Sequence, residues 1–115
     1  MHSVAMIRKE LVAASAEPLI LALLAKGESY GYAIIQEVRE RSGGHLQWTD
    51  GMLYPVLHRM ERRGLIKSRW GESETGRKRK YYSLKEDGKK AHIKHREHWM
   101  KVHETLAGLW KEKYV

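Results

Sequence analysis

Residues 49–84 constrain the fold of this chain more than any other stretch, because a helical pattern is followed at once by two strand-like segments. After Asp50, apolar side chains recur at helical spacing and share one face: Leu53, Val56, Leu57 and Met60. Gly64, which follows two arginines, is typical of the residue that ends a helix. The sequence therefore predicts a helix from about Asp50 to Gly64 with one side buried in a core.

The opposite face of this helix is polar, and the apolar stripe does not interrupt it. A turn of about 100° per residue places on it Gly51, Pro55, His58 and Arg62, with Tyr54 and Arg59 beside them. Tyr54, Pro55 and His58 are not the strong helix-formers expected on a surface that contacts nothing. Pro55 also lacks a backbone N–H, which predicts irregular first turns and favours a contact surface at the start of the helix.

Two strand-like segments follow, at residues 65–70 and 80–84, and a polar loop with Gly71 and Gly76 separates them. The loop ends in four consecutive cations, here called the cationic tetrad: Arg77, Lys78, Arg79 and Lys80. A helix with a polar outer face, followed by a hairpin with a basic tip, is typical of a winged helix-turn-helix, whose second helix enters the DNA major groove. The predicted fold is mainly α with a small β-hairpin.

The residues before this helix predict two further helices. Residues 1–14 are expected to form a loosely helical lead-in, and Ser15 is expected to cap a helix that ends at Gly27. A second predicted helix follows a cap at Ser29 and points inward with Tyr32, Ile35 and Val38. We expect residues 45–48 to add a third strand to the small sheet.

The last predicted helix spans residues 86–111 and carries a regular seam. Its members are spaced by three or four residues: Gly88, Ala91, His95, Trp99, Val102, Leu106 and Leu109. We expect this helix to pair with its copy about a two-fold axis, because a domain this small leaves it no core to cover. The apolar surface of residues 19–25, with Leu19 and Leu23, is expected to join the interface.

Positive charge concentrates on the predicted helix end and hairpin. The chain has 22 Lys and Arg against 14 Asp and Glu, which gives a net charge of +8. Nine of these cations and only three of the acids lie between Arg59 and Lys80, so this stretch holds six of the eight net charges. The predicted partner is therefore nucleic acid, with cations along its phosphates.

Other classes of protein receive little support. The chain has no cysteine, so it has no disulfide or thiolate site, and a reducing cytoplasm fits. The apolar run at residues 18–25 is too short to cross a membrane, and a signal peptide is not recognisable. Histidines at 92, 95, 98 and 103 lack the carboxylate or thiolate that would complete a metal site. We expect a cytoplasmic protein that is not an enzyme and that uses neither a metal nor a cofactor.

Two segments resemble the signature of the PadR family of bacterial transcriptional regulators. One begins at Leu53 and reads L-Y-P-V-L-H-R-M-E-R-R-G-L-I; the other begins at Arg77 and reads R-K-R-K-Y-Y-S-L-K-E-D-G. The resemblance extends from about Leu19 to the end of the chain. It implies a winged helix-turn-helix DNA-binding domain at residues 1–84 and a C-terminal dimerisation helix at 85–115. The expected protein is a homodimeric repressor whose affinity for an inverted-repeat DNA operator falls when an effector binds.

Within this prediction the DNA-binding residues have two roles. The start of the helix is expected to meet base edges through Asp50, Tyr54, Pro55 and His58. Phosphates are expected to be met by Arg59, Arg62 and the cationic tetrad. Two alternatives remain: an unregulated basic module that binds DNA architecturally or binds RNA, and a protein–protein adaptor that uses the winged helix as a scaffold.

The short branch of the PadR family, with one C-terminal helix, includes regulators that bind flat aromatic drugs between symmetry-related tryptophans. The resemblance implies this effector-binding role for Trp99. Small Gly88 and Ala91 leave the seam unevenly filled beside it, which favours a gap there. The alternative is that Trp99 only packs the dimer interface, where tryptophan is common with or without a ligand.

Overall fold

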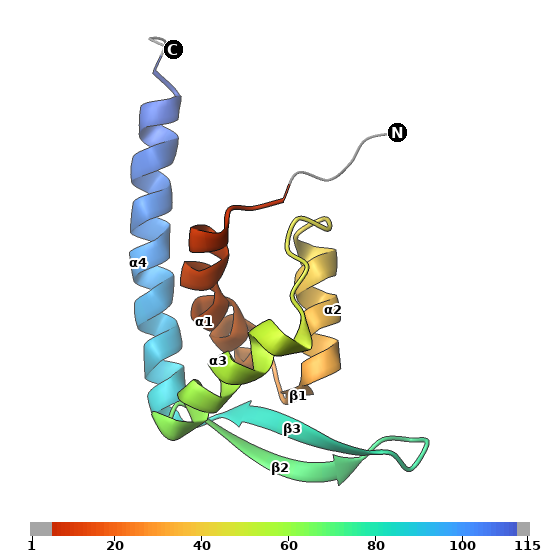
Figure 1. Cartoon of the computed structure of the whole chain (residues 1–115). Helices are drawn as coiled ribbons and strands as arrows, with labels where there is room; N and C mark the ends of the chain where they lie inside the picture. The colour runs from red at the N-terminus through yellow and green to blue at the C-terminus, as the bar shows by residue number, and fades with distance from the viewer. Residues whose placement is uncertain (1–5, 113–115) are drawn as a thin grey trace, which may run out of the picture.

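The computed structural model describes residues 6–112, which form a helical domain on a small sheet with one long helix standing beside it (Figure 1). The elements follow in the order α1 (Lys9–Ala25), β1 (Ser29–Tyr30), α2 (Gly31–Arg41), α3 (Asp50–Arg62), β2 (Ile66–Glu72), β3 (Lys78–Leu84) and α4 (Glu86–Trp110). This is the predicted mainly α winged-helix fold. Neither α4 nor any other helix among these residues is both long and apolar enough to cross a membrane.

The sheet is antiparallel with the strand order β1-β3-β2. Its two long strands pair from Ile66 opposite Leu84 to Glu72 opposite Lys78, so the hairpin is longer than predicted. The third strand is β1, not residues 45–48. Those residues alternate apolar and polar side chains because Leu46 and Trp48 are buried in the core, and they lie outside the strands of the sheet.

The core lies between the sheet and helices α1, α2 and α3. Its fully buried large side chains are Ile20, Leu21, Ile34, Leu53, Leu57, Met60 and Ile66. The predicted stripe of α3 is confirmed, with Val56 half-buried at its edge. In α2 the inward prediction is confirmed at Val38, which is buried, and wrong at Tyr32, which is exposed. Because α2 starts at Gly31, Ile34 fills the core in place of Tyr32.

Helix α1 starts at Lys9, six residues before the predicted cap. Ser15 lies inside it, and its hydroxyl donates a hydrogen bond to the Val12 carbonyl at 3.1 Å. Residues 1–5 of the predicted lead-in lie outside the described chain. The apolar surface after Pro18 mostly fills the chain's own core. Leu23 in particular is only 9% exposed, so it is withdrawn from the predicted dimer interface.

The first half of α4 packs on its own domain, contrary to the expectation that it has no core to cover. Gly88 is buried against the α3–β2 junction, where the Lys85 amide donates to the Leu65 carbonyl at 3.0 Å. Ala91 packs on the edge of the core. The C-terminal part of α4 extends past the start of α1 (Figure 1), and its seam is exposed at Val102, Leu106 and Leu109.

Candidate nucleic-acid interface

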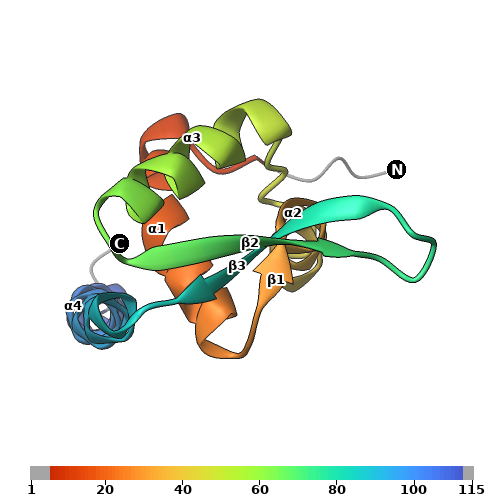
Figure 2. The ribbon, with the colours of Figure 1, turned by 90° about the horizontal axis from the view of Figure 1, so that it is seen from below.

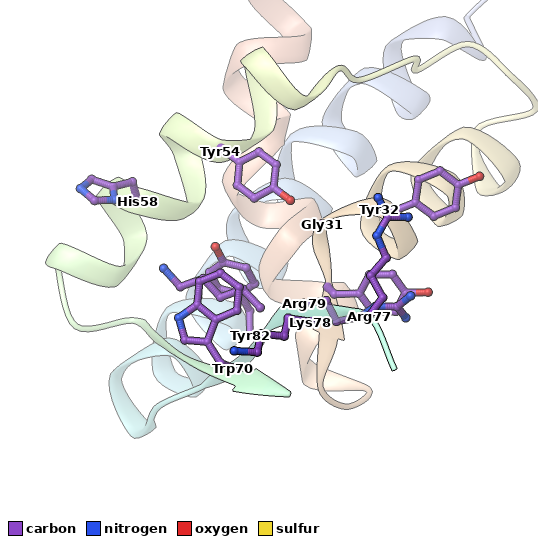
Figure 3. A pocket seen from close by; sticks show the side chains of 11 residues that line it. Gly31, Tyr32, Tyr54, His58, Trp70, Arg77, Lys78, Arg79 and Tyr82 are labelled. Carbon is purple, nitrogen blue, oxygen red and sulfur yellow. The ribbon is translucent and has the colours of Figure 1, made fainter. Parts of the chain in front are cut away.

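Helix α3 presents its polar face because its first turn is capped and its other face is anchored in the core. The Thr49 hydroxyl accepts a hydrogen bond from the Met52 amide at 3.2 Å. Tyr54, Pro55 and His58 are exposed on the outward side, and Figure 3 shows the side chains of Tyr54 and His58 there. The helix is continuous through Pro55, so the predicted irregular start is not observed.

The start of α2 lies directly against this face of α3. A Cβ atom on Gly31 would overlap the hydroxyl oxygen of Tyr54, so a larger residue at position 31 would displace the Tyr54 side chain (Figure 3). The next residue, Tyr32, is 66% exposed. Tyr32 and Tyr54 therefore lie on one surface, where the start of α2 meets α3.

A groove of about 780 Å³, here called the basic groove, lies between α3, the start of α2 and the β2–β3 hairpin (Figure 3). The hairpin, residues 66–84, is called the wing; its tip extends past the helices (Figure 2). The groove is lined by Tyr30, Gly31, Tyr32, Tyr54, His58, Trp70, Arg77, Lys78, Arg79, Lys80 and Tyr82. Because this lining contains cations and no acidic side chain, it attracts polyanions.

The tip of the wing carries the outer pair of the cationic tetrad, Arg77 and Lys78, which are both exposed. The turn that presents them closes where the Ser73 amide donates to the Arg77 carbonyl at 2.8 Å. Gly76 has a φ of 79°, a left-handed conformation that favours glycine. The backbone of the loop therefore positions these two cations, and their side chains extend into solvent.

The inner pair of the tetrad lies on aromatic rings. The guanidinium of Arg79 is 4.0 Å from the centre of the Tyr30 ring. The ammonium of Lys80 is 6.0 Å from the ring centre of Trp70 and 5.9 Å from that of Tyr82. Cations at these distances are attracted to the ring faces. The inner cations are thus held by side chains from β1, β2 and β3, unlike the outer pair.

One cation of the wing is already neutralised within the chain. Arg69 donates two hydrogen bonds to Glu28, from Nε to Oε2 at 2.8 Å and from Nη2 to Oε1 at 2.6 Å. The hydrogen bond from Arg69 lowers the pKa of the Glu28 carboxyl. The Arg69 guanidinium also lies 4.8 Å from the centre of the Tyr81 ring, which meets Tyr30 edge-on at 5.6 Å between centroids. These contacts attach the wing to Tyr30 of β1 and to Glu28, which precedes β1.

The structure brings only part of the predicted DNA-binding set into the basic groove. Tyr54, His58 and the tetrad line it, whereas outside it on α3 lie Asp50, Pro55, Arg59 and Arg62. The aromatic part of the lining was not predicted: Tyr30, Tyr32, Trp70 and Tyr82. A signal for Trp70 existed, since residues alternate faces along a strand and a hairpin sets this tryptophan opposite a cation, Lys80.

A second groove, here called the apolar groove, measures about 550 Å³ and lies between α1 and α4. Most of its lining is apolar and includes Leu11 and Leu19 from α1 and Trp99 and Met100 from α4. Trp99 is 37% exposed. A hollow beside Trp99 was predicted between two copies of α4, and the hollow seen here lies within one chain.

An ion-pair cluster joins the apolar groove to the end of α3. The two carboxylate oxygens of Glu17 lie 2.5 Å from Nη1 of Arg63 and 3.0 Å from Nε2 of His95. Burial alone would raise the pKa of Glu17, but the hydrogen bonds from His95 and Arg63 outweigh it and lower the pKa below its ordinary value. His95, predicted for the dimer seam, thus contacts its own chain. Across residues 6–112 no group of His, Asp and Glu could hold a metal ion.

Solved structures of bacterial regulators have the same fold as this chain. A PadR family transcription regulator from Clostridium difficile is 33% identical, with a TM-score of 0.74, and the match covers 84% of this chain and 98% of that one. A PadR-like transcriptional regulator from Bacillus cereus is 26% identical with a TM-score of 0.81, and the match covers 91% and 100%. A transcriptional regulator from Clostridium thermocellum is 28% identical with a TM-score of 0.79, covering 93% and 100%.

Sequence comparison points to the same group. An uncharacterized protein from Lysinibacillus sphaericus is 31% identical over 101 residues, which cover 88% of this chain and 93% of that protein. Residues 20–94 match the sequence profile described as the transcriptional regulator PadR-like family. The matched stretch includes α2, α3, the wing and the packed part of α4. The chain therefore belongs to the PadR-like family of transcriptional regulators.

Proposed function

We propose that this DNA-binding regulator is a ligand-responsive repressor that acts as a dimer on an inverted-repeat operator in the cytoplasm. The observation that carries the proposal is the basic groove, where the polar face of α3 and the cations of the wing border one concave surface. A helix enters the major groove in such folds, and a neighbouring hairpin can then reach the phosphates beside it.

Recognition of the base sequence is assigned to the first three turns of α3. The first two turns, where a recognition helix meets base edges, carry Asp50, Tyr54 and Pro55, and His58 follows one turn after Tyr54 on the same face. Arg59 and Arg62 occupy the last turn, and with the outer pair of the tetrad they are placed to contact phosphates. Phosphate contacts fix the orientation of α3, whereas base contacts determine which sequence is bound.

Dimerisation is assigned to the second half of α4. Its seam continues the face that packs on α1 in the first half, but Val102 is 55% exposed and Leu106 and Leu109 are exposed as well. An apolar stripe on a helix that projects from its domain is stabilised by pairing with a second copy. Two copies about a two-fold axis present two α3 helices, which matches half-sites about one helical turn apart or a multiple of it.

The effector is proposed to be a flat aromatic molecule that contacts Trp99. This side chain lies where α4 leaves its own domain, at the edge of the apolar groove and next to the proposed dimer seam. A ligand that favours one separation of the two domains shifts the protein toward that arrangement. The distance between the two α3 helices would change with it, and operator affinity would fall.

The test is a selection of duplexes by the purified protein from a random pool, followed by binding measurements on selected and random sequences. We expect Tyr54→Ala and His58→Ala to lower affinity for the selected duplex by about tenfold more than for random DNA, as base-reading positions do. Arg77→Ala is the matched control, because removal of a cation that meets a phosphate should weaken both duplexes equally. If each of the three variants lost the same affinity for the selected duplex as for random DNA, the result would favour an unregulated architectural module.

A further inference from the structure

Trp70 has an unusual position for a large aromatic side chain, because 70% of it is exposed on the outer part of the wing. Alternate residues of β2 point to the same face of the sheet. On that face Ile66 is buried in the core, and the Ser68 hydroxyl donates to Glu61 of α3 at 2.7 Å. Trp70 comes next and lines the basic groove below His58 (Figure 3). Trp70 therefore lies on the face of β2 that covers the core, but beyond the edge of the core, where its indole is exposed.

Lys80 lies opposite Trp70 in the strand register and shares its face. Its ammonium is about equally distant from two rings, 6.0 Å from Trp70 and 5.9 Å from Tyr82, and its side chain is half-buried. In the part of the chain that the structure describes, no carboxylate forms an ion pair with Lys80. The groove therefore holds an apolar ring and an unneutralised cation side by side.

A dimer formed through α4 would not cover this pair. The projecting end of α4 and the wing lie at opposite ends of the molecule (Figure 1). The other exposed tryptophans, Trp99 and Trp110, are both on α4. Because the dimer leaves Trp70 exposed, we expect the molecule bound in the basic groove to cover it. That molecule must combine apolar surface with negative charge.

We propose that Trp70 and Lys80 together hold one sugar–phosphate strand of the bound DNA. The indole packs on the C–H surface of a deoxyribose, and the Lys80 ammonium contacts the adjacent phosphate. Both contacts are independent of base sequence, so their role is affinity and the positioning of α3 in the major groove. The inference rests on the proposed function, because it assumes that DNA occupies the basic groove.

A protein with Trp70 as its single tryptophan tests the contact directly. It carries Trp48→Phe, Trp99→Phe and Trp110→Phe; the buried indole N–H of Trp48 has no hydrogen-bond partner among the described residues, so phenylalanine there loses no such bond. Binding to a random-sequence 30-base-pair duplex is followed by anisotropy of a dye on the DNA, and Trp70 is followed by acrylamide quenching. We expect quenching to fall at least about twofold when DNA binds, because a ring packed on the strand is shielded from solvent.

Unchanged quenching while the anisotropy rises would overturn the proposed contact and leave DNA binding intact. If the unaltered chain binds no duplex at all, in the selection or here, both the proposed function and this inference are wrong. Circular dichroism shows whether the single-tryptophan protein is folded. If it is unfolded, quenching is measured on the unaltered chain and on its Trp70→Phe variant, and the difference between the two gives the signal of Trp70.

Substitutions in the otherwise unaltered chain separate the two partners. Trp70→Ala is expected to weaken binding to random and selected duplexes alike, by about tenfold, without changing the dependence on salt. Trp70→Phe should retain most of the affinity. Lys80→Met keeps the aliphatic stem, and it should reduce the slope of log K against log salt by about 0.9. Full affinity in Trp70→Ala, or a weakening confined to the selected duplex, would contradict the contact with the strand.

Discussion

Gly88 determines how closely α4 approaches the rest of the domain. A Cβ atom there would overlap the backbone oxygen of Leu65, and this oxygen also accepts the hydrogen bond from Lys85 that starts α4. A backbone oxygen cannot move aside as a flexible side chain can. We predict that Gly88→Ala lowers the free energy of unfolding by at least about 2 kcal/mol, because α4 must shift.

Gly108 is the matched control on the same helix. Nothing lies within 4 Å of a Cβ atom built on it, and it is outside the seam. Gly108→Ala should raise the free energy of unfolding by about 0.5–1 kcal/mol, since alanine restricts the unfolded chain and favours helix. Urea denaturation measures the free energy of unfolding of both variants. If Gly88→Ala left this free energy unchanged, the packing of α4 would not depend on the close approach at Gly88.

Glu17 gives the stability of the domain a defined dependence on pH. Its pKa in the folded chain lies below the ordinary value of about 4.5, so the folded state favours the ionised carboxylate. That contribution is fully present above pH 4.5 and is lost as the pH falls through the lower folded pKa. We predict that Glu17→Gln destabilises the chain at neutral pH and that the difference from the unaltered chain shrinks below pH 4.5.

The measurement is urea denaturation at a series of pH values from neutral to strongly acidic. Glu97→Gln serves as the control, because Glu97 is exposed on α4 and has no side-chain partner in the described structure. That variant should follow the unaltered chain at every pH. A difference between Glu17→Gln and the unaltered chain that stays constant on acidification would show that the ionised carboxylate is not what links α1, α3 and α4.

The cations of the wing are not equivalent. Arg77 and Lys78 reach solvent at its tip, whereas Arg69 is bound to Glu28 through two hydrogen bonds. We predict that replacing Arg77 and Lys78 by alanine reduces the slope of log K against log salt by about 0.9 for each phosphate that these cations neutralise. Affinity should fall on operator and random DNA alike.

Arg69→Ala provides the comparison within the same hairpin. It removes one positive charge, but that charge is already balanced by Glu28, so the salt dependence should change little. Binding to one duplex at several salt concentrations gives all three slopes. An unchanged slope in the Arg77 and Lys78 variant would mean that the tip of the wing does not touch DNA.

Helix α3 and the hairpin could be predicted because their patterns are local. The α3 stripe repeats over several turns, and one glycine ends it. By contrast, β1 has two residues, Ser29 and Tyr30, and exists because they pair with Tyr82 and Tyr81 some fifty residues later. Residues 45–48 alternate like a strand, but their alternation reflects burial of a connection over the core. Such distinctions depend on tertiary contacts that a local pattern does not contain.

The candidate site likewise has features that a local sequence pattern predicts and features that depend on residues far apart in the chain. The tetrad is visible as a run of four residues, and its place beside α3 follows from the fold. Its separation into an outer and an inner pair is not visible, because Arg79 and Lys80 are held by rings on three different strands. The start of α4 was predicted as part of a dimer seam for a related reason: a regular apolar spacing does not say whether its partner is another copy or the same chain.

Helix α4 connects the domain to its proposed copy. We predict that Val102→Glu or Leu106→Glu converts the dimer to monomers, because two like charges would be buried where the copies meet. Sedimentation at micromolar concentration should give twice the chain mass for the unaltered protein and the chain mass for either variant. Ile93→Glu is the control, since Ile93 is 58% exposed on another side of the same helix. Variants at 102 and 106 that remain dimeric would place the interface elsewhere.

The effector site provides the last prediction. A flat aromatic ligand between two indoles gains stacking and buried area with few polar requirements, so we expect modest affinity and broad selectivity. A planar aromatic dye should quench tryptophan emission and saturate at one dye per dimer, because a site formed by Trp99 and its symmetry mate lies on the two-fold axis. Trp99→Ala should abolish this quenching while dimerisation and operator binding persist, and Trp110→Ala should preserve it. Two dyes per dimer would instead place the ligand in the apolar groove of each chain, and failure of a broad panel to bind would leave Trp99 with a packing role alone.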